Sequence, residues 1–509
     1  MADNFISYLF SISVLVLLPI FAGLIVISPF YPNNAVKIRR FAKGFCVFNL
    51  IYSLFFMLFT GSEIGHPDGN FSFIYTLPIE ILPNITLSFA MDNFSALMCV
   101  LTCFIMLIAL VASKSMIISK QKLFYSLMLL LQGAILGIFT ANNLFTFVLF
   151  WELELIPVYF LISMWGGASA KKSAQKFILF TFAGSVFMLI ATALIYAYGA
   201  DAGIPLDFGT LFEKAGDFPV LLQLVVSLGF VLAFIVKLPV FGFHSWLADA
   251  HTDAPTPVSM VLAGILLKTG AYGLIRINLQ MFQEVFQLIA PSLIFLGALG
   301  VLWASYTAIA QSDIKRMIAF SSIAHMGIIL IGIASFSDFG LNGAVFHMVS
   351  HALISAGLFM GAGIIYQKFK TRKLELLGRL SGYMPHFTVL IMFLGLAAIG
   401  MPLTMGFPGE IMSLAGGFIS PLVDTEYFAS NLIQPSVLFA VTGIILSATY
   451  ILRLFHKTFF GIPQNEPQNN PLREKIRLSN HQIAVLSILA LGIIIFGLYP
   501  MGIINMIAF

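Results

Sequence analysis

About fourteen long apolar segments follow one another along the 509-residue chain, and only short polar loops separate them. A helix needs about 20 apolar residues to cross the hydrocarbon core of a bilayer. Segments of this length without alternation of apolar and polar residues are too long for barrel strands. The pattern predicts an all-α polytopic membrane protein with about fourteen transmembrane helices. The segments lie roughly at 1–28, 42–61, 94–113, 122–140, 144–165, 175–198, 219–240, 257–277, 286–309, 316–334, 340–366, 386–416, 432–455 and 482–505.

The composition agrees with a lipid-facing surface and excludes several classes of protein. Charged residues make up 9% of the chain and hydrophobic residues 59%, whereas soluble domains carry about 25% charged residues. The net charge of +4 is too diffuse for a nucleic-acid surface. The three cysteines lie in apolar segments without disulfide or iron–sulfur spacing, and the sequence has no glycine-rich nucleotide loop. We therefore expect no cofactor, no metal and no nucleic-acid partner for this chain.

The charges of the loops predict how the chain is oriented in the membrane. The loops after the first, third, fifth and eleventh segments are basic, whereas the loop after the sixth carries Asp201 and Asp207. Because lysine and arginine are retained on the cytoplasmic side, we expect both termini on the non-cytoplasmic side. The first segment has Asp3 ahead of it and no small-residue cleavage site, so we expect it to remain as a span.

Proline and glycine gather inside two apolar segments, at 237–257 and 400–409. Such residues free backbone groups that protein or water must then satisfy, so they predict broken helices in spans seven and twelve. The two spans are five apart, an odd number, and this favours two inverted five-helix repeats with sites near the membrane midplane. The expected divisions are spans one to three (1–113), spans four to eight (114–280), spans nine to thirteen (281–460), and a loop with span fourteen (461–509).

Ionisable side chains inside the apolar segments are the candidates for function, because each costs about 2.5–3.5 kcal/mol at the bilayer centre. A buried lysine tends to lose its proton and a buried carboxylate tends to keep one. Histidine titrates near neutrality and suits a relay step. The set therefore predicts proton transfer. Its members are Glu152, Lys237, Lys268, His325, His351 and Glu410.

We expect Glu152 to pair with Lys237, so that a small movement could load or unload a proton. The pair could also be purely structural, Lys268 could reach an interface, and His325 could be an ordinary core histidine. Glu154 lies two residues from Glu152 and therefore faces roughly 200° away on a helix. We expect Glu154 to point to another interface and give it a secondary role.

Three further residues carry weaker signals. His244 lies near the predicted helix break, where it is either part of a proton entry or a loop residue. His347 and His351 are one helical turn apart, which is a metal-ligand spacing, but no carboxylate or thiol completes a site in the sequence. Arg276 lies near the end of span eight, and we expect it to anchor that span at the interface.

Four long motifs resemble the antiporter-like subunits of respiratory complex I. They are 151–167 (WELELIPVYFLISMWGG), 236–256 (VKLPVFGFHSWLADAHTDAPT), 261–273 (VLAGILLKTGAYG) and 311–327 (QSDIKRMIAFSSIAHMG). The best match is to subunit M, the equivalent of mitochondrial subunit four. Glu410 supports it, because the sister subunits L and N carry lysine at that place. The Trp-Glu-Leu-Glu-Leu form resembles that of the cyanobacterial and plastid branch of this subunit.

The resemblance implies a proton-translocating subunit driven by quinone reduction elsewhere in a complex-I-type oxidoreductase of the bacterial inner or thylakoid membrane. Flavin, iron–sulfur clusters and quinone would lie in partner subunits, and the partners would be L-type and N-type chains, small membrane subunits and lipid. Lys237 would be the switching lysine with Glu152 as its carboxylate, and Lys268 the central relay. His325 and His351 would bridge to Glu410, the terminal carrier. The alternatives are a subunit of a Mrp-type cation/proton antiporter or membrane-bound hydrogenase, or a membrane scaffold.

Overall fold

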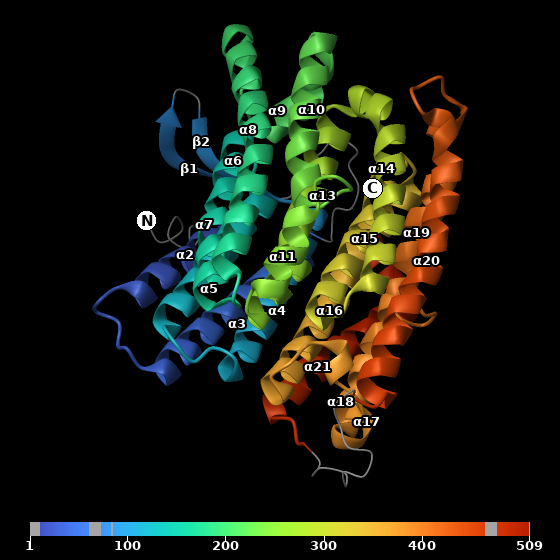
Figure 1. Cartoon of the computed structure of the whole chain (residues 1–509). Helices are drawn as coiled ribbons and strands as arrows, with labels where there is room; N and C mark the ends of the chain where they lie inside the picture. Colours follow the sequence, from blue (N-terminus) through green and yellow to red (C-terminus); the bar gives the residue numbers. More distant parts are fainter. Residues whose placement is uncertain (1–10, 61–72, 83–84, 464–475, 508–509) are drawn as a thin grey trace.

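The computed structural model describes residues 11–60, 73–82, 85–463 and 476–507, and Figure 1 shows that they form mainly long helices lying side by side. Within this part of the chain, twelve helices are long and apolar enough to cross a membrane. Two shorter apolar helices, Ile12–Ile27 and Pro385–Ala398, coincide with further predicted segments. The chain is therefore an integral multi-pass membrane protein, as the apolar segments predicted. Residues 1–10 of the first predicted span lie outside the described residues.

The N-terminal part contains four helices and one hairpin. Strands β1 and β2 pair antiparallel, so a hairpin stands where the sequence indicated a loop, while the fold as a whole remains all-α. Asp92 caps the helix after the hairpin by accepting a hydrogen bond from the Ser95 amide at 2.8 Å. The elements are α2 (Ile12–Ile27), α3 (Ala35–Thr60), β1 (Phe73–Leu82), β2 (Ile85–Met91), α4 (Asn93–Ala112) and α5 (Gln121–Thr140).

The central part begins with a helix that is interrupted at Glu154, between α6 and α7. Pro157 has no amide hydrogen to donate to the carbonyl of Leu153, and this explains the interruption. The elements are α6 (Leu144–Leu153), α7 (Leu155–Trp165), α8 (Ala170–Ala202), α9 (Phe208–Lys214), α10 (Val220–Lys237), α11 (Ser245–Asp253), α12 (Thr256–Val261), the π-helix η3 (Leu262–Leu266), α13 (Leu267–Gly273) and the π-helix η4 (Leu274–Leu279).

The C-terminal part continues with long helices. They are α14 (Gln283–Ala310), α15 (Ile314–Ala334), α16 (Asp338–Phe369), α17 (Leu380–Tyr383), α18 (Pro385–Ala398), α19 (Gly406–Phe418), α20 (Ile433–Phe455), the π-helix η8 (His456–Phe460), α21 (Asn480–Leu498) and α22 (Met501–Ile507). Short 3-10 turns connect several elements, namely η1 (Ser113–Ser115), η2 (Ala215–Asp217), η5 (Leu374–Leu376), η6 (Pro421–Asp424) and η7 (Ser430–Leu432).

Both proline- and glycine-rich stretches interrupt helices where the sequence predicts it. Residues 238–244 separate α10 from α11, and Gly242 there has a φ of +91°. The indole of Trp246 donates to the Val236 carbonyl at 2.9 Å and so satisfies a group that the interruption frees. Residues 399–405 separate α18 from α19, with a φ of +76° at Gly400. The first interruption directly follows Lys237, and the second directly precedes α19, the helix that carries Glu410.

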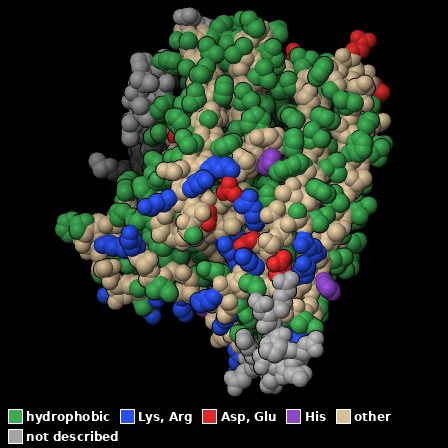
Figure 2. Space-filling model, viewed as in Figure 1, with side chains coloured by type: hydrophobic (Ala, Val, Ile, Leu, Met, Phe, Trp, Pro, Cys, Tyr) green, Lys and Arg blue, Asp and Glu red, His purple; other side chains and the backbone are tan. Residues whose placement is uncertain are grey.

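The core of the bundle is formed by three continuous stretches of helix. The apolar windows within Thr256–Leu279, Ile314–Ala334 and Asp338–Phe369 are 100% buried, against 33% within Ala170–Ala200. Outer helices such as α8 and α20 expose large apolar side chains, as lipid or partner contact requires. Figure 2 shows hydrophobic side chains over most of one face and lysine and arginine gathered over its lower part.

Candidate functional site

Lys237 is the last residue of α10, where the chain leaves the helix for the interruption at 238–244. Its ammonium forms an ion pair with the carboxylate of Glu154, and the two side chains are 1% and 0% exposed. The same ammonium lies 4.9 Å from the ring centre of Trp151 and 5.9 Å from that of Phe177. This lysine–glutamate pair is thus a charge pair held among aromatic rings.

The prediction that Glu152 is the contact partner of Lys237 is wrong. Glu152 is half-buried, whereas Glu154 is fully enclosed. The Glu152 carboxylate is close enough to interact electrostatically with Lys237, but among the described residues the ion pair of Lys237 is with Glu154. The rotation of α6 decides between them. The secondary role given to Glu154 was therefore too small for its position, and the role of Glu152 in proton transfer stays a prediction.

One signal in the sequence could have found the correct carboxylate. Phe147, Trp151, Glu154 and Val158 recur at helical spacing and are all buried. The aromatic members mark the face that packs into the protein, and Glu154 shares that face with them.

Lys268 lies in the short α-helix α13, between the π-helices η3 and η4. The side chain is completely buried. Its ammonium is 2.7 Å from Nδ1 of His351 in α16 and 2.5 Å from the carbonyl oxygen of Ala263. A π-helix widens the backbone turn and is frequent at functional sites. Here the η3 turn supplies a carbonyl to Lys268.

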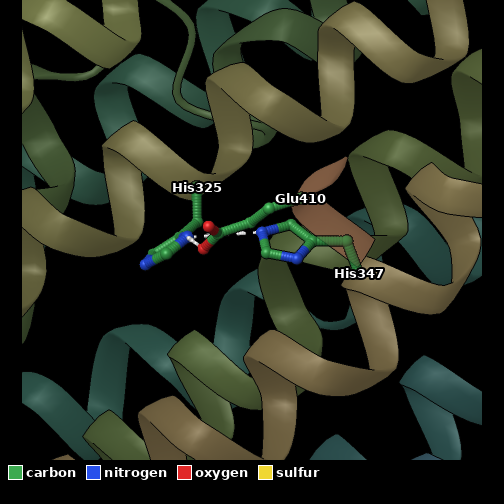
Figure 3. Close-up of side chains that lie close together, drawn as sticks. All are labelled: His325, His347 and Glu410. Atoms are coloured by element: carbon green, nitrogen blue, oxygen red, sulfur yellow. Dashed lines mark hydrogen bonds and ion pairs between the residues drawn. The ribbon is translucent and has the colours of Figure 1, made fainter. Parts of the chain in front are cut away.

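The imidazole of His351 continues this contact to two further histidines and one acid. Its ring centre is 5.3 Å from that of His325 in α15. Nδ1 of His325 is 3.3 Å from Nε2 of His347 and 3.4 Å from the carboxylate of Glu410 in α19. Figure 3 shows the last three side chains converging from three helices. We call Lys268, His351, His325, His347 and Glu410 the relay cluster.

Close backbone approach makes this convergence possible. A β-carbon on Gly409 would lie 2.8 Å from Cα and Cβ of His347, so a larger residue would push α19 away from α16. A β-carbon on Gly400 would meet the Glu410 carboxylate, which packs directly against that glycine. The proline- and glycine-rich interruption thus serves to bring Glu410 against the histidines.

The relay cluster also contains a possible set of metal ligands. His325, His347 and Glu410 offer ligand atoms that all lie within 4.8 Å of one another. The sequence analysis noted His347 and His351 but found no carboxylate to complete a site, because Glu410 is far away in sequence. A cation bound at this place would lie close to the Lys268 ammonium beside His351, and the two positive charges would compete for stabilisation by the same neighbouring groups.

Among the residues that the structure describes, no ion pair or hydrogen bond joins Lys237 to Lys268. The predicted set therefore divides into the lysine–glutamate pair and the relay cluster. His244 belongs to neither. Its ring packs at a tilt against Trp303, with ring centres 4.3 Å apart, and stacks on Phe241.

Three ionisable residues are buried although their place in the sequence indicates a loop or the end of a span. His251 is fully buried and stacks on Phe359, with ring centres 4.6 Å apart. Lys315 is also buried and donates to the hydroxyl of Ser259 at 2.9 Å. Each lies in a polar stretch at the end of a span, where a sequence pattern indicates exposure. These residues are best found from the packing of α11 and α15.

Arg276 is the third, and the expectation that it anchors span eight at the interface is wrong. Its guanidinium is buried and pairs with Asp92 at 2.6 Å, joining η4 to the start of α4. Burial acts to raise the pKa of Asp92, but Arg276 and the Ser95 amide outweigh it and hold that pKa below its ordinary value. The pair fixes the far end of the span that carries Lys268.

Two family models match the chain. Residues 141–423, more than half of its length, match the model described as NADH:quinone oxidoreductase/Mrp antiporter, TM. Residues 68–138 match the model described as NADH-ubiquinone oxidoreductase chain 4, amino terminus. The second model covers the region outside the four motifs noted in the sequence.

Curated relatives agree with these models over nearly the whole chain. The NAD(P)H-quinone oxidoreductase chain 4, chloroplastic, of Chara vulgaris is 36% identical over 493 residues, which are 96% of each chain. The NAD(P)H-quinone oxidoreductase chain 4 1 of Synechococcus sp. (strain JA-3-3Ab) is 40% identical over 81% of this chain and 76% of its own.

Two solved structures share the fold. A chain of respiratory complex I from Thermus thermophilus with bound NADH superposes with a TM-score of 0.81 at 24% identity, over 97% of both chains. A chain of the Mrp complex from Dietzia sp. DQ12-45-1b superposes with a TM-score of 0.83 at 19% identity, over 98% of this chain and 96% of that one. The fold is therefore common to both kinds of complex, while the family models and relatives are more specific: the chain belongs to the family of NAD(P)H-quinone oxidoreductase chain 4, the antiporter-like membrane subunits of complex-I-type enzymes.

Proposed function

We propose that this subunit moves protons through the membrane arm of a complex-I-type NAD(P)H-quinone oxidoreductase, driven by quinone reduction in neighbouring subunits. The observation that carries the proposal is the relay cluster. From Lys268 to Glu410, each titratable side chain lies against the next, and the helices α13, α15 and α16 around them are buried. Groups within hydrogen-bond reach can exchange protons directly or through one water.

The lysine–glutamate pair would act as the switch at the entrance to the relay cluster. In a low-dielectric interior, each charge of a pair stabilises the other. When a buried lysine is separated from its carboxylate, it gives up its proton more readily. Lys237 is suited to such movement because α10 ends there, at the interruption, so a change in residues 238–244 would shift the ammonium relative to Glu154.

Finer aspects of the architecture belong to the same proposal. Fourteen spans would include two inverted repeats, one from α5 to η4 and one from α14 to α20, with the interruptions at 238–244 and 399–405 in equivalent places. The basic end of the molecule would face the cytoplasm or its plastid counterpart, and both termini the opposite side of a bacterial inner or thylakoid membrane.

The partners would be L-type and N-type chains and small membrane subunits. Flavin, iron–sulfur clusters and quinone would be held by other subunits of the complex.

The test is proton pumping by the assembled complex in membrane vesicles that contain Lys237→Ala. We expect pumping to be lost while the complex still assembles, because the switch has no group to load. Lys171→Ala is the matched control, since Lys171 is an exposed lysine at the start of α8, in the basic loop after the fifth segment. Wild-type pumping by assembled Lys237→Ala complexes would contradict the proposal, as would co-purification of the chain with cation-antiporter subunits and no quinone-reducing partner.

A further inference from the structure

A small cavity lies beside Glu410 and His325. It is lined by residues of α14, α15, α19 and α20 and has a volume of about 10 Å³. This is roughly the space that the centre of a single water molecule requires. A water in such a place is stable only if two to four polar groups bind it.

The polar atoms around the cavity meet that requirement. Glu410, Ser305, Ser447 and Tyr450 all line it. The hydroxyls of Ser305 and Tyr450 are buried and have no hydrogen-bond partner among the described residues. Leaving a buried hydroxyl unpaired costs about 1–3 kcal/mol, so two of them facing one space indicate a missing ligand.

Neighbouring groups do not supply that partner. Ser447 donates to the carbonyl of Ile444 at 2.7 Å, and this leaves its oxygen free to accept a hydrogen bond from a bound molecule. Ser321 lies near Tyr450 and donates to the carbonyl of Ile318 at 2.8 Å, and its oxygen makes no hydrogen bond of normal geometry with the Tyr450 hydroxyl among the described residues. The charge of Glu410 also acts on Tyr450, and both side chains line the same cavity.

The walls of the cavity cannot close over it. Gly443 of α20 packs against Val301 of α14 so closely that a β-carbon there would clash. The two helices are already in contact at this glycine and cannot approach further to fill the space. The cavity is therefore a fixed feature of the packing between α14 and α20.

We propose that this cavity binds one water molecule, which bridges Glu410 to Tyr450 and Ser305 and so turns the proton path from the relay cluster toward α14 and α20. The inference rests on the proposed function and adds a route of departure to it. The O–H bond of Glu410 breaks as the water oxygen takes its proton, which leaves a Glu410 carboxylate and a hydronium ion between Tyr450 and Ser305. Tyr450 and Ser305 are positioning residues for that water.

The experiment compares Tyr450→Phe and Ser305→Val in the assembled complex with Ser436→Ala as the control. Tyr450→Phe removes the hydroxyl oxygen of the tyrosine, and Ser305→Val removes a hydroxyl and fills its space with a methyl group. Ser436 is also buried, but at another place on α20. One readout is the carboxyl stretching band of Glu410 in infrared spectra, identified by its loss in Glu410→Gln. The other readout is the pumping rate in vesicles.

We expect both variants to shift the Glu410 band and to lower the pumping rate roughly fivefold, the fold-change that corresponds to one hydrogen bond of about 1 kcal/mol. Ser436→Ala changes neither. An unmoved band together with wild-type pumping in Tyr450→Phe overturns the water site. If Ser305→Val fails to assemble, Tyr450→Phe decides alone. The failure of the proposed function is separate: it shows as wild-type pumping in Lys237→Ala, whereas the Glu410 band reports the water site whether or not the complex pumps.

Discussion

The lysine–glutamate pair and the relay cluster are both buried in the membrane bundle, but they solve different problems. The pair consists of two opposite charges that meet at helix ends or interruptions, where Lys237 closes α10 and Glu154 lies between α6 and α7. The relay cluster consists of one acid, one lysine and three histidines. The lysine and the histidines lie on the continuous helices of the core, and only Glu410, on α19, follows an interruption.

This difference indicates a division of labour. A single strong charge pair has two arrangements, closed and open, and suits a switch that a conformational change can bias. A row of groups, most of them neutral when unprotonated, can pass a proton along with small changes in charge at each step. The comparison predicts that charge is essential at the pair, whereas the ability to exchange a proton is essential in the relay cluster.

The largest effect is expected from Lys268→Arg, which keeps a positive charge but replaces a group that can lose its proton by one that cannot. Because proton transfer by a positioned group contributes about 10²–10⁴-fold, we expect the pumping rate to fall by roughly two orders of magnitude. The measurement is vesicle acidification by the assembled complex. Lys315→Arg is the control, since Lys315 is also a buried lysine but lies outside the relay cluster. Near-normal pumping with Lys268→Arg would mean that only charge matters there.

An intermediate effect is expected from Glu154→Gln, which removes one partner of the charge pair. Breaking a buried pair costs about 3–5 kcal/mol because the remaining charge is left uncompensated. We expect both the thermal stability of the complex and its pumping rate to fall, and the double change Glu154→Gln with Lys237→Met to restore stability alone. Glu152→Gln, two residues away and half-buried, is the matched control for the stability measurement. A larger stability loss from Glu152→Gln would contradict the observed pairing.

Much of this arrangement could be predicted from the sequence because the bilayer imposes simple rules. Apolar runs indicate the helices, and the proline- and glycine-rich stretches at 238–244 and 399–405 indicate where they break. The cost of a charge in lipid singles out Lys237, Lys268 and Glu410 as residues with a purpose. None of these inferences needs the packing of one helix against another.

The remaining features depend on that packing. Apolar residues surround α6, so no polar face reveals its rotation, and only the helical spacing of Phe147 and Trp151 with Glu154 indicates which carboxylate faces inward. Arg276 finds Asp92, 184 residues away in the chain, and looks like an interfacial residue until α4 is placed beside η4. His347 was judged by its spacing to His351, whereas its nearest partners come from α15 and α19.

The smallest effect is expected from Trp151→Phe, and it separates the two regions most finely. The ring of Trp151 lies 4.9 Å from the Lys237 ammonium, and its indole also donates to Ser185 at 3.1 Å. Phenylalanine keeps an aromatic face but attracts a cation less strongly, by about 0.5–1 kcal/mol. If the closed and open states of the pair are nearly equal in free energy, this loss favours the open state and changes the pumping rate by roughly two- to fivefold.

Trp165→Phe is the control, because Trp165 packs on Phe124 and donates to the carbonyl of Ser119, with no cation beside it in the described residues. Equal rates for the two variants would show that the aromatic rings around Lys237 only fill space. A specific change with Trp151→Phe would show that these rings set the balance between the closed and open pair. The relay cluster has no counterpart to this control, because among the described residues its lysine lies against the imidazole of His351 and not against a phenylalanine, tyrosine or tryptophan ring.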